Sequence, residues 1–100
     1  MSAYDFDAEP WRWTGNGAQW VFVTVPEGIA DEVESLQSGR GRGFGAVRVR
    51  VTIGATTWET SMFPSTEHGS YILPLKAPVR TAERIVVGSA VNVHIALVQT

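Results

Sequence analysis

The sequence contains no cysteine, and this absence removes two classes of structure. Without thiols the chain can form neither a disulfide framework nor a thiolate metal site. It has no apolar run long enough to span a membrane. The first ten residues are acidic and lack the basic-then-apolar pattern of a secretory signal. These absences predict a soluble cytoplasmic protein that does not enter a membrane.

Residues that commonly carry catalysis are also scarce. The two histidines, His68 in a polar loop and His94 on an expected strand, have no carboxylates near them at metal-ligand spacing. There is no Gly-x-Ser-x-Gly elbow. Ser61 has no base near it in the sequence, and Glu59 is a single carboxylate without an acid–base partner. The sequence therefore predicts a protein that is not an enzyme and that binds neither a metal nor a cofactor.

Charge is modest and unevenly distributed. The formal net charge is −2, with most acids in residues 1–39 and most arginine and lysine in residues 40–100. Nucleic-acid-binding proteins usually present a strongly basic face, so this balance does not favour a nucleic-acid partner. One hundred residues is the size of one small domain. We expect residues 1–100 to form a single domain that is a monomer or a weak homodimer.

Apolar and polar residues alternate along much of the chain, which predicts a mainly β protein. The expected strands cover residues 4–13, 20–25, 47–53, 56–63, 71–76 and 91–97. The first two are predicted to form a hairpin around Thr14-Gly15-Asn16-Gly17, with Pro10 at an edge or a bulge. Gly88, just before the last strand, is expected to adopt a positive φ.

Two short helices interrupt the strands. Pro26 can begin a helix that ends at Ser38-Gly39. Ile29, Val33 and Leu36 recur at helical spacing and form one apolar stripe. A second helical turn is expected over residues 78–84 and joins the last two strands in a compact strand–turn–Gly–strand unit, 71–98.

The glycine-rich segment 39–45 resembles two kinds of binding motif, but the residues that follow it disfavour both. Arg42-Gly43-Phe44-Gly45 matches the start of an RNA-recognition signature, but Ala46 and Val49 stand where that signature needs aromatic residues. A phosphate-binding loop would lead into a helix, whereas this segment leads into a strand. We interpret it as a flexible connection in which Arg40 and Arg42 could meet an anion.

Motifs along nearly the whole chain resemble the DUF1905 family. They are Phe6-Asp7-Ala8-Glu9, Trp20 to Pro26, Val47 to Gly54, Trp58 to Pro64, Tyr71 to Lys76, and Val91-Asn92-Val93. The resemblance implies a small closed double-split β-barrel, with two pseudo-two-fold-related halves in one chain. The swapped-hairpin barrels of some bacterial transcription regulators and antitoxins share this architecture. The family has no established activity, so the resemblance implies no catalytic residue.

These observations favour a non-enzymatic binding or structural module. Its candidate binding residues are basic groups near the most regular strands and one tryptophan: Arg48, Arg50, Lys76, Arg80 and Trp58. The four tryptophans are expected to lie mostly in the core. An alternative is a small-molecule pocket at one barrel end, lined by Trp11, Trp20 or Trp58. Nucleic-acid binding is a further alternative that follows from fold analogy alone.

Overall fold

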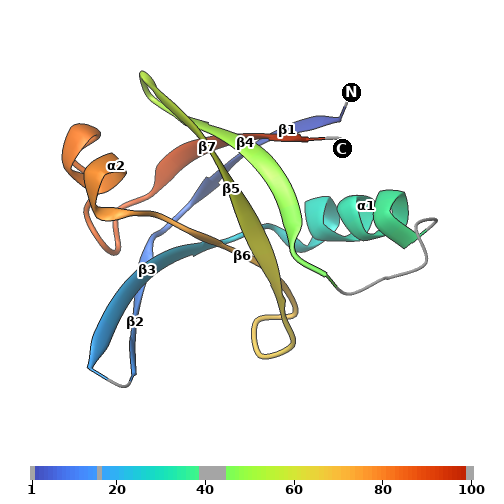
Figure 1. The fold of residues 1–100 in the computed structure, drawn as a ribbon, viewed down its shortest axis with the longest axis horizontal. Helices are drawn as coiled ribbons and strands as arrows, with labels where there is room; N and C mark the ends of the chain where they lie inside the picture. Colours follow the sequence, from blue (N-terminus) through green and yellow to red (C-terminus); the bar gives the residue numbers. More distant parts are fainter. Residues whose placement is uncertain (1, 16, 39–44, 99–100) are drawn as a thin grey trace.

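The computed structural model describes residues 2–15, 17–38 and 45–98. Within these residues, seven antiparallel strands form one sheet that curls into a half-barrel, accompanied by two short helices (Figure 1). The strands are β1 (Ala3–Ala8), β2 (Trp11–Gly15), β3 (Ala18–Thr24), β4 (Val47–Ile53), β5 (Thr56–Ser65), β6 (Ser70–Pro74) and β7 (Val91–Leu97). The helices are α1 (Glu27–Ser38) and α2 (Ala77–Ala82). The order across the sheet is β1-β7-β4-β5-β6-β3-β2.

The first predicted strand divides at Pro10. β1 pairs with β7, whereas β2 pairs with β3. Proline has no N–H to donate, so a hydrogen-bond ladder cannot continue through it. The carbonyl of Pro10 instead accepts a 2.9 Å hydrogen bond from the amide of Gly88. The predicted hairpin over residues 4–25 is therefore confirmed for β2 and β3 and wrong for β1.

The segment from β6 to β7 joins two separate parts of the sheet. β6 lies between β5 and β3, and β7 lies between β1 and β4, so the two strands do not pair with each other. The predicted helical turn between them is α2. Gly88 has a φ of +91°, which confirms the positive φ that was expected from its position.

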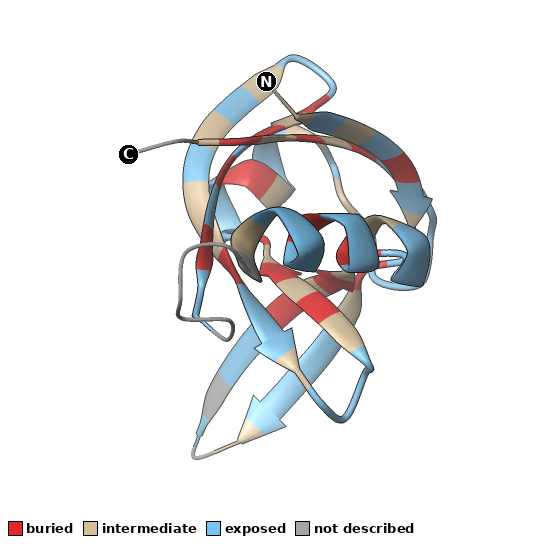
Figure 2. Ribbon diagram, turned by 90° about the vertical axis from the view of Figure 1, so that its right-hand side faces the viewer, coloured by how far each residue is buried: buried red, intermediate tan, exposed pale blue. Residues whose placement is uncertain are grey.

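The core fills the inner side of the curled sheet. Alternate residues of β3, β4, β6 and β7 point inward, as the predicted alternation requires, and Figure 2 shows buried segments on the strands behind α1. The most deeply buried side chains are aliphatic: Val23, Val33, Val49, Val51, Met62, Leu73, Val93 and Ile95. Burial of such side chains stabilises a fold by about 1.5–3 kcal/mol each.

Helix α1 begins at Glu27, one residue after the predicted start, and extends to Ser38. It makes only part of the predicted contact surface. Ala30 and Val33 are buried and Ile29 is partly buried, whereas Leu36 is exposed. The first turns of the helix make the contact with the sheet, so the apolar stripe ends before its last turn. Among the described residues, neither helix has the length and apolar composition needed to cross a membrane.

The prediction that most tryptophans lie in the core is wrong. Trp13 and Trp20 are 44% and 50% exposed, and Trp11 and Trp58 are only half-buried. On β2 and β3 the indoles occupy the face opposite to buried Val21. The alternation was identified correctly, but the inner face is filled by smaller aliphatic side chains.

Candidate functional site

Five aromatic side chains gather on the outer side of the sheet. Residues that lie directly opposite each other in an antiparallel pair project to the same face. Trp13 lies opposite Trp20, and Val21, next to Trp20 on β3, is buried, so both indoles project outward. Phe63 of β5, opposite Ile72 of β6, belongs to the same outer side. We call this set the aromatic face: Trp11, Trp13, Trp20, Phe22 and Phe63.

The aromatic face is open to solvent and hollowed. Trp20 is 50%, Phe63 45% and Trp13 44% exposed. Together with Ile72 and residues at the β5–β6 connection, the face lines an open hollow of about 350 Å³. Small-molecule sites in proteins have volumes of about 300–1,000 Å³ and apolar walls with a few polar groups. The size and lining of the hollow therefore suit a small ligand.

Three rings of the aromatic face are held by specific contacts. The indole N–H of Trp11 donates a 2.9 Å hydrogen bond to the hydroxyl of Thr24. The ring centroids of Trp11 and Phe22 are 5.1 Å apart. Trp20 stacks on Phe22, with ring centroids 6.1 Å apart and planes inclined by 13°. Aromatic pairs at these distances attract each other. Trp11, Phe22 and Trp20 thus form a packed cluster within the aromatic face.

The Trp13 indole packs against Gly15, which leaves room for it. A Cβ atom at Gly15 would come within 2.6 Å of the Cζ2 and Cη2 atoms of the Trp13 indole. The benzene part of the indole therefore occupies the space that a side chain at Gly15 would need.

The end of β5 and its connection to β6 supply the polar groups of the hollow. The imidazole of His68 stacks on Trp11, with ring centroids 4.5 Å apart. The hydroxyl of Ser65 lies 2.9 Å from Nδ1 of His68 and also accepts a 3.4 Å hydrogen bond from its backbone N–H. Glu67, between them, lines the hollow as well. In Figures 1 and 2, this connection and the β2–β3 hairpin extend toward the same end of the molecule.

A second hollow continues the aromatic face toward α2. It also measures about 350 Å³ and shares Trp20 and Phe63 with the first. Pro74 adds apolar surface to this second hollow, and Lys76 adds a cationic group. The predicted binding residue Lys76 therefore lies beside the aromatic face.

The predicted basic residues are only partly brought together. Arg48 and Arg50 are exposed on the outer face of β4, as their alternation indicated. Both face Glu59 of β5, at 4.0 Å and 2.9 Å respectively. One carboxylate thus offsets part of their charge. Arg80 lies on α2, where its Nε donates a 3.0 Å hydrogen bond to the carbonyl of Leu75.

Trp58 lies apart from the arginines and from the other tryptophans. It is opposite Val51, whose side chain is buried, so its indole is on the inner side and packs against the core. Its Nε1 is buried and has no hydrogen-bond partner among the described residues. Of the three tryptophans predicted to line a pocket, Trp11 and Trp20 share one hollow and Trp58 does not line it.

Other sequence predictions concern residues with no place in this site. His94 projects away from the core and lies 3.0 Å from a carboxylate oxygen of Asp5. Across the described ranges, no three histidine, aspartate or glutamate side chains lie close enough to hold a metal ion. The hypotheses that invoke Arg40, Arg42 and the glycines at 39–44 lie outside the described residues.

The comparisons with known proteins identify a family and no activity. A family model described as a domain of unknown function, DUF1905, matches residues 6–95. None of the curated proteins compared with the chain matches it. The matched range contains the whole aromatic face and the two arginines of β4.

Proposed function

Because this chain belongs to the DUF1905 family, whose function is unknown, we propose a function from geometry: a non-enzymatic module that binds a small ring-shaped ligand on the aromatic face. The observation that carries the proposal is the hollow of about 350 Å³ in which Trp13 and Trp20 each leave nearly half of their surface exposed. Folded proteins seldom expose large contiguous apolar patches unless the patch binds something.

The chemistry of the hollow defines the kind of ligand. The flat sides of indole rings carry negative charge density and attract other rings and the apolar C–H side of a sugar. Stacking of a nucleobase on an aromatic side chain is worth about 1–3 kcal/mol. Ser65, Glu67 and His68 offer hydrogen bonds at one edge. The ligand is therefore expected to have one flat apolar side and a hydrogen-bonding rim, as both nucleosides and pyranose sugars have.

Isothermal titration calorimetry with adenosine, cytidine and cellobiose tests the proposal and separates the two sources of such rings. Trp20→Ala should weaken binding of the active probe at least about tenfold, because it removes one stacking surface. Trp58→Phe is the matched control, since that indole lies on the inner side of the sheet, and should leave affinity within about twofold.

Lack of binding by all three probes would contradict the proposal, as would equal affinity of wild type and Trp20→Ala. A dimer in analytical ultracentrifugation that Trp20→Ala dissociates would also contradict it, because the aromatic face would then bind a second copy of the chain.

Anion binding by Arg48 and Arg50 is the second candidate function. It is supported by their exposure side by side on β4. Glu59 lies within 4.0 Å of both side chains, so we expect weak binding that declines with salt. Titration with pyrophosphate at low ionic strength tests it: Glu59→Gln should strengthen binding and Arg50→Gln should weaken it, and no response to either change would contradict it.

We also propose that the curled sheet is a closed double-split barrel formed by one domain, residues 1–100. Two observations support closure. β1 and β2, at opposite ends of the strand order, follow each other in the chain and are separated by two residues. The strand pairings also have an internal two-fold symmetry when β1 and β2 are counted as one strand. Each pairing becomes another existing pairing when β1–β2 is exchanged with β5, β3 with β6, and β4 with β7.

Closure within one chain predicts a monomer with no free sheet edge available to a second copy. Sedimentation velocity over a hundredfold range of concentration should show one monomeric species. A dimer that persists at the lowest concentration would contradict closure within a single chain.

A further inference from the structure

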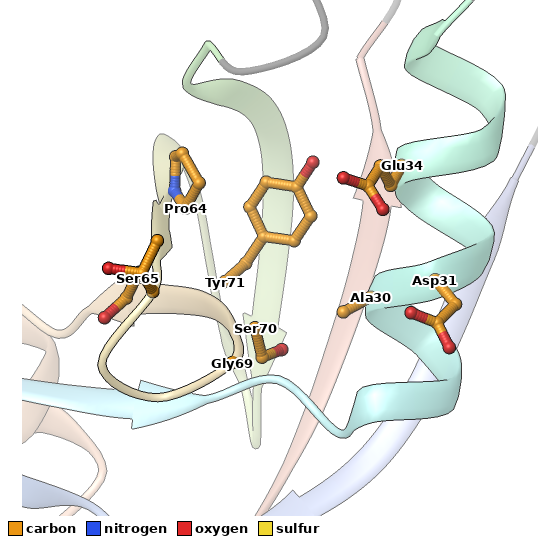
Figure 3. A pocket seen from close by; sticks show the side chains of 9 residues that line it. Ala30, Asp31, Glu34, Pro64, Ser65, Gly69, Ser70 and Tyr71 are labelled. Carbon is orange, nitrogen blue, oxygen red and sulfur yellow. The ribbon is translucent and has the colours of Figure 1, made fainter.

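A separate cleft lies between α1 and the β5–β6 connection, and its chemistry differs from that of the two hollows at the aromatic face. It measures about 210 Å³ and shares only Ser65 with the aromatic hollow. Figure 3 shows Asp31 and Glu34 of α1 on one side of the cleft, Pro64 and Ser65 on the other, and Tyr71 between them. The cleft is too small for a stacked ring with substituents but is large enough for a short aliphatic chain.

Tyr71 forms the floor of the cleft and has an unused polar group. Its side chain is only 6% exposed. Its hydroxyl group extends beyond the ring on the side of Glu34 (Figure 3). No described residue forms a hydrogen bond with it, and it is not among the fully buried atoms without a partner, so it remains open to solvent. The arrangement therefore provides a hydrogen-bonding position at the base of the cleft that the described part of the chain does not fill.

The opposite wall carries two carboxylates without a counter-charge. Asp31 and Glu34 are three residues apart and so lie on the same face of α1. Among the described residues, neither forms an ion pair. Two like charges at this spacing repel each other. The Glu34 carboxylate is also close enough to Tyr71 to add to the effect of burial in raising the pKa of its phenol.

The remaining walls are uncharged. Ala30 and Pro64 supply apolar surface, and the hydroxyl of Ser70 already donates a hydrogen bond to the carbonyl of Val25. The hydroxyl oxygen of Ser70 keeps a lone pair for an incoming donor. The cleft thus combines negative charge, hydrogen-bond acceptors and a short apolar wall.

We propose that this cleft binds a primary alkylammonium group. The N–H donors of such a group would bond to the carboxylate of Glu34 and the hydroxyl oxygen of Tyr71, which lie on the same side of the cleft in Figure 3. Asp31, on the same face of α1, would add negative charge. The methylene groups next to the nitrogen would lie against Ala30 and Pro64. A free diamine and the side chain of a lysine both present this chemistry. The site is independent of the aromatic face.

Titration calorimetry at low ionic strength with putrescine and with N-acetyl-lysine methylamide tests the proposal and separates the two sources. Glu34→Gln should weaken binding at least about tenfold, because a charge-assisted hydrogen bond is lost. Tyr71→Phe, which keeps the buried ring, should weaken it about three- to tenfold. Both variants should retain a cooperative thermal unfolding transition.

Two control variants separate a built site from general attraction to an acidic helix. Glu27→Gln removes one charge from α1 outside the cleft and should change the affinity less than about twofold. Trp20→Ala should leave the affinity unchanged, so failure of the aromatic-face proposal would not affect this result. Absence of saturable binding by either probe would overturn the inference. An equal loss of affinity in Glu27→Gln and Glu34→Gln would also overturn it.

Discussion

The imidazole of His68 stacks against the indole of Trp11, with ring centroids 4.5 Å apart and planes inclined by 22°. The two residues come from parts of the chain that are far apart in sequence, and their contact joins the β5–β6 connection to β2. Ser65 fixes the imidazole through its hydroxyl, 2.9 Å from Nδ1. The position of this connection therefore sets one end of the hollow at the aromatic face.

Replacement of His68 by alanine should disturb the aromatic face without unfolding the protein. The side chain is exposed, so the free energy of unfolding should change by no more than about 0.5 kcal/mol. Loss of the stacked ring should shift the indole N–H resonance of Trp11 in a ¹⁵N-correlated spectrum. His94→Ala, on β7, is the control and should leave that resonance in place. An unchanged Trp11 resonance in His68→Ala would contradict the contact.

Two tryptophan-to-phenylalanine changes should differ in their effect on stability. Trp11→Phe removes a hydrogen bond to Thr24, which contributes about 0.5–1.5 kcal/mol. Trp58→Phe removes a buried N–H that has no described partner and so relieves a desolvation penalty of about 1–3 kcal/mol. Urea unfolding should show a smaller loss of stability for Trp58→Phe. A larger loss for Trp58→Phe would mean that its indole N–H is satisfied in solution.

Gly88→Val should destabilise the fold through the backbone. A Cβ atom at Gly88 would meet nothing within 4 Å, so the effect arises from its φ of +91°. Such a conformation is a genuine outlier for a β-branched residue and raises the free energy of the folded state by about 1–3 kcal/mol. Gly28→Ala in α1 is the control and should stabilise by about 0.5–1 kcal/mol. Equal melting temperatures for wild type and Gly88→Val would contradict the strained position.

Stability should decline at alkaline pH because of Tyr71. Burial first, and then the Glu34 carboxylate, raise its pKa above the ordinary value of 10.0. The folded protein therefore holds the phenolic proton more tightly than the unfolded chain does. This contribution is complete below pH 10 and is lost as the pH rises through the raised pKa.

Urea unfolding between pH 9 and pH 11 should thus show a steeper decline for wild type than for Tyr71→Phe. The pKa of Tyr4 is also raised, by burial and by Glu32, so Tyr4→Phe measures that second contribution separately. Identical slopes for wild type and Tyr71→Phe would contradict the assignment to Tyr71.

Local patterns in the sequence were sufficient to predict α1 and the strands from β3 to β7, whereas β1 and β2 were expected as one strand. Alternation placed Arg48 and Arg50 outward and Val49 and Val51 inward, and all four lie as predicted. Proline chemistry identified Pro10 as an interruption. It did not indicate that β1 would pair with β7, because a ladder's partner is determined by contacts far apart in sequence.

The candidate site was harder to predict because it depends on which of two faces is buried. A period of two residues places Trp13 and Trp20 on one face of their strands but does not say which face meets the core. Their large apolar area suggested burial, whereas the curled sheet is filled by valine and other aliphatic side chains. The role of His68 was missed as well, because it requires the β5–β6 connection to contact β2.

An NMR titration observing the four indole N–H resonances is the most direct test of ligand binding at the aromatic face. Addition of adenosine or cellobiose should shift the resonances of Trp13 and Trp20 saturably while that of Trp58, on the inner side, stays in place. The absence of a saturable shift with both probes, or an equal shift of Trp58, would contradict ligand binding at this surface.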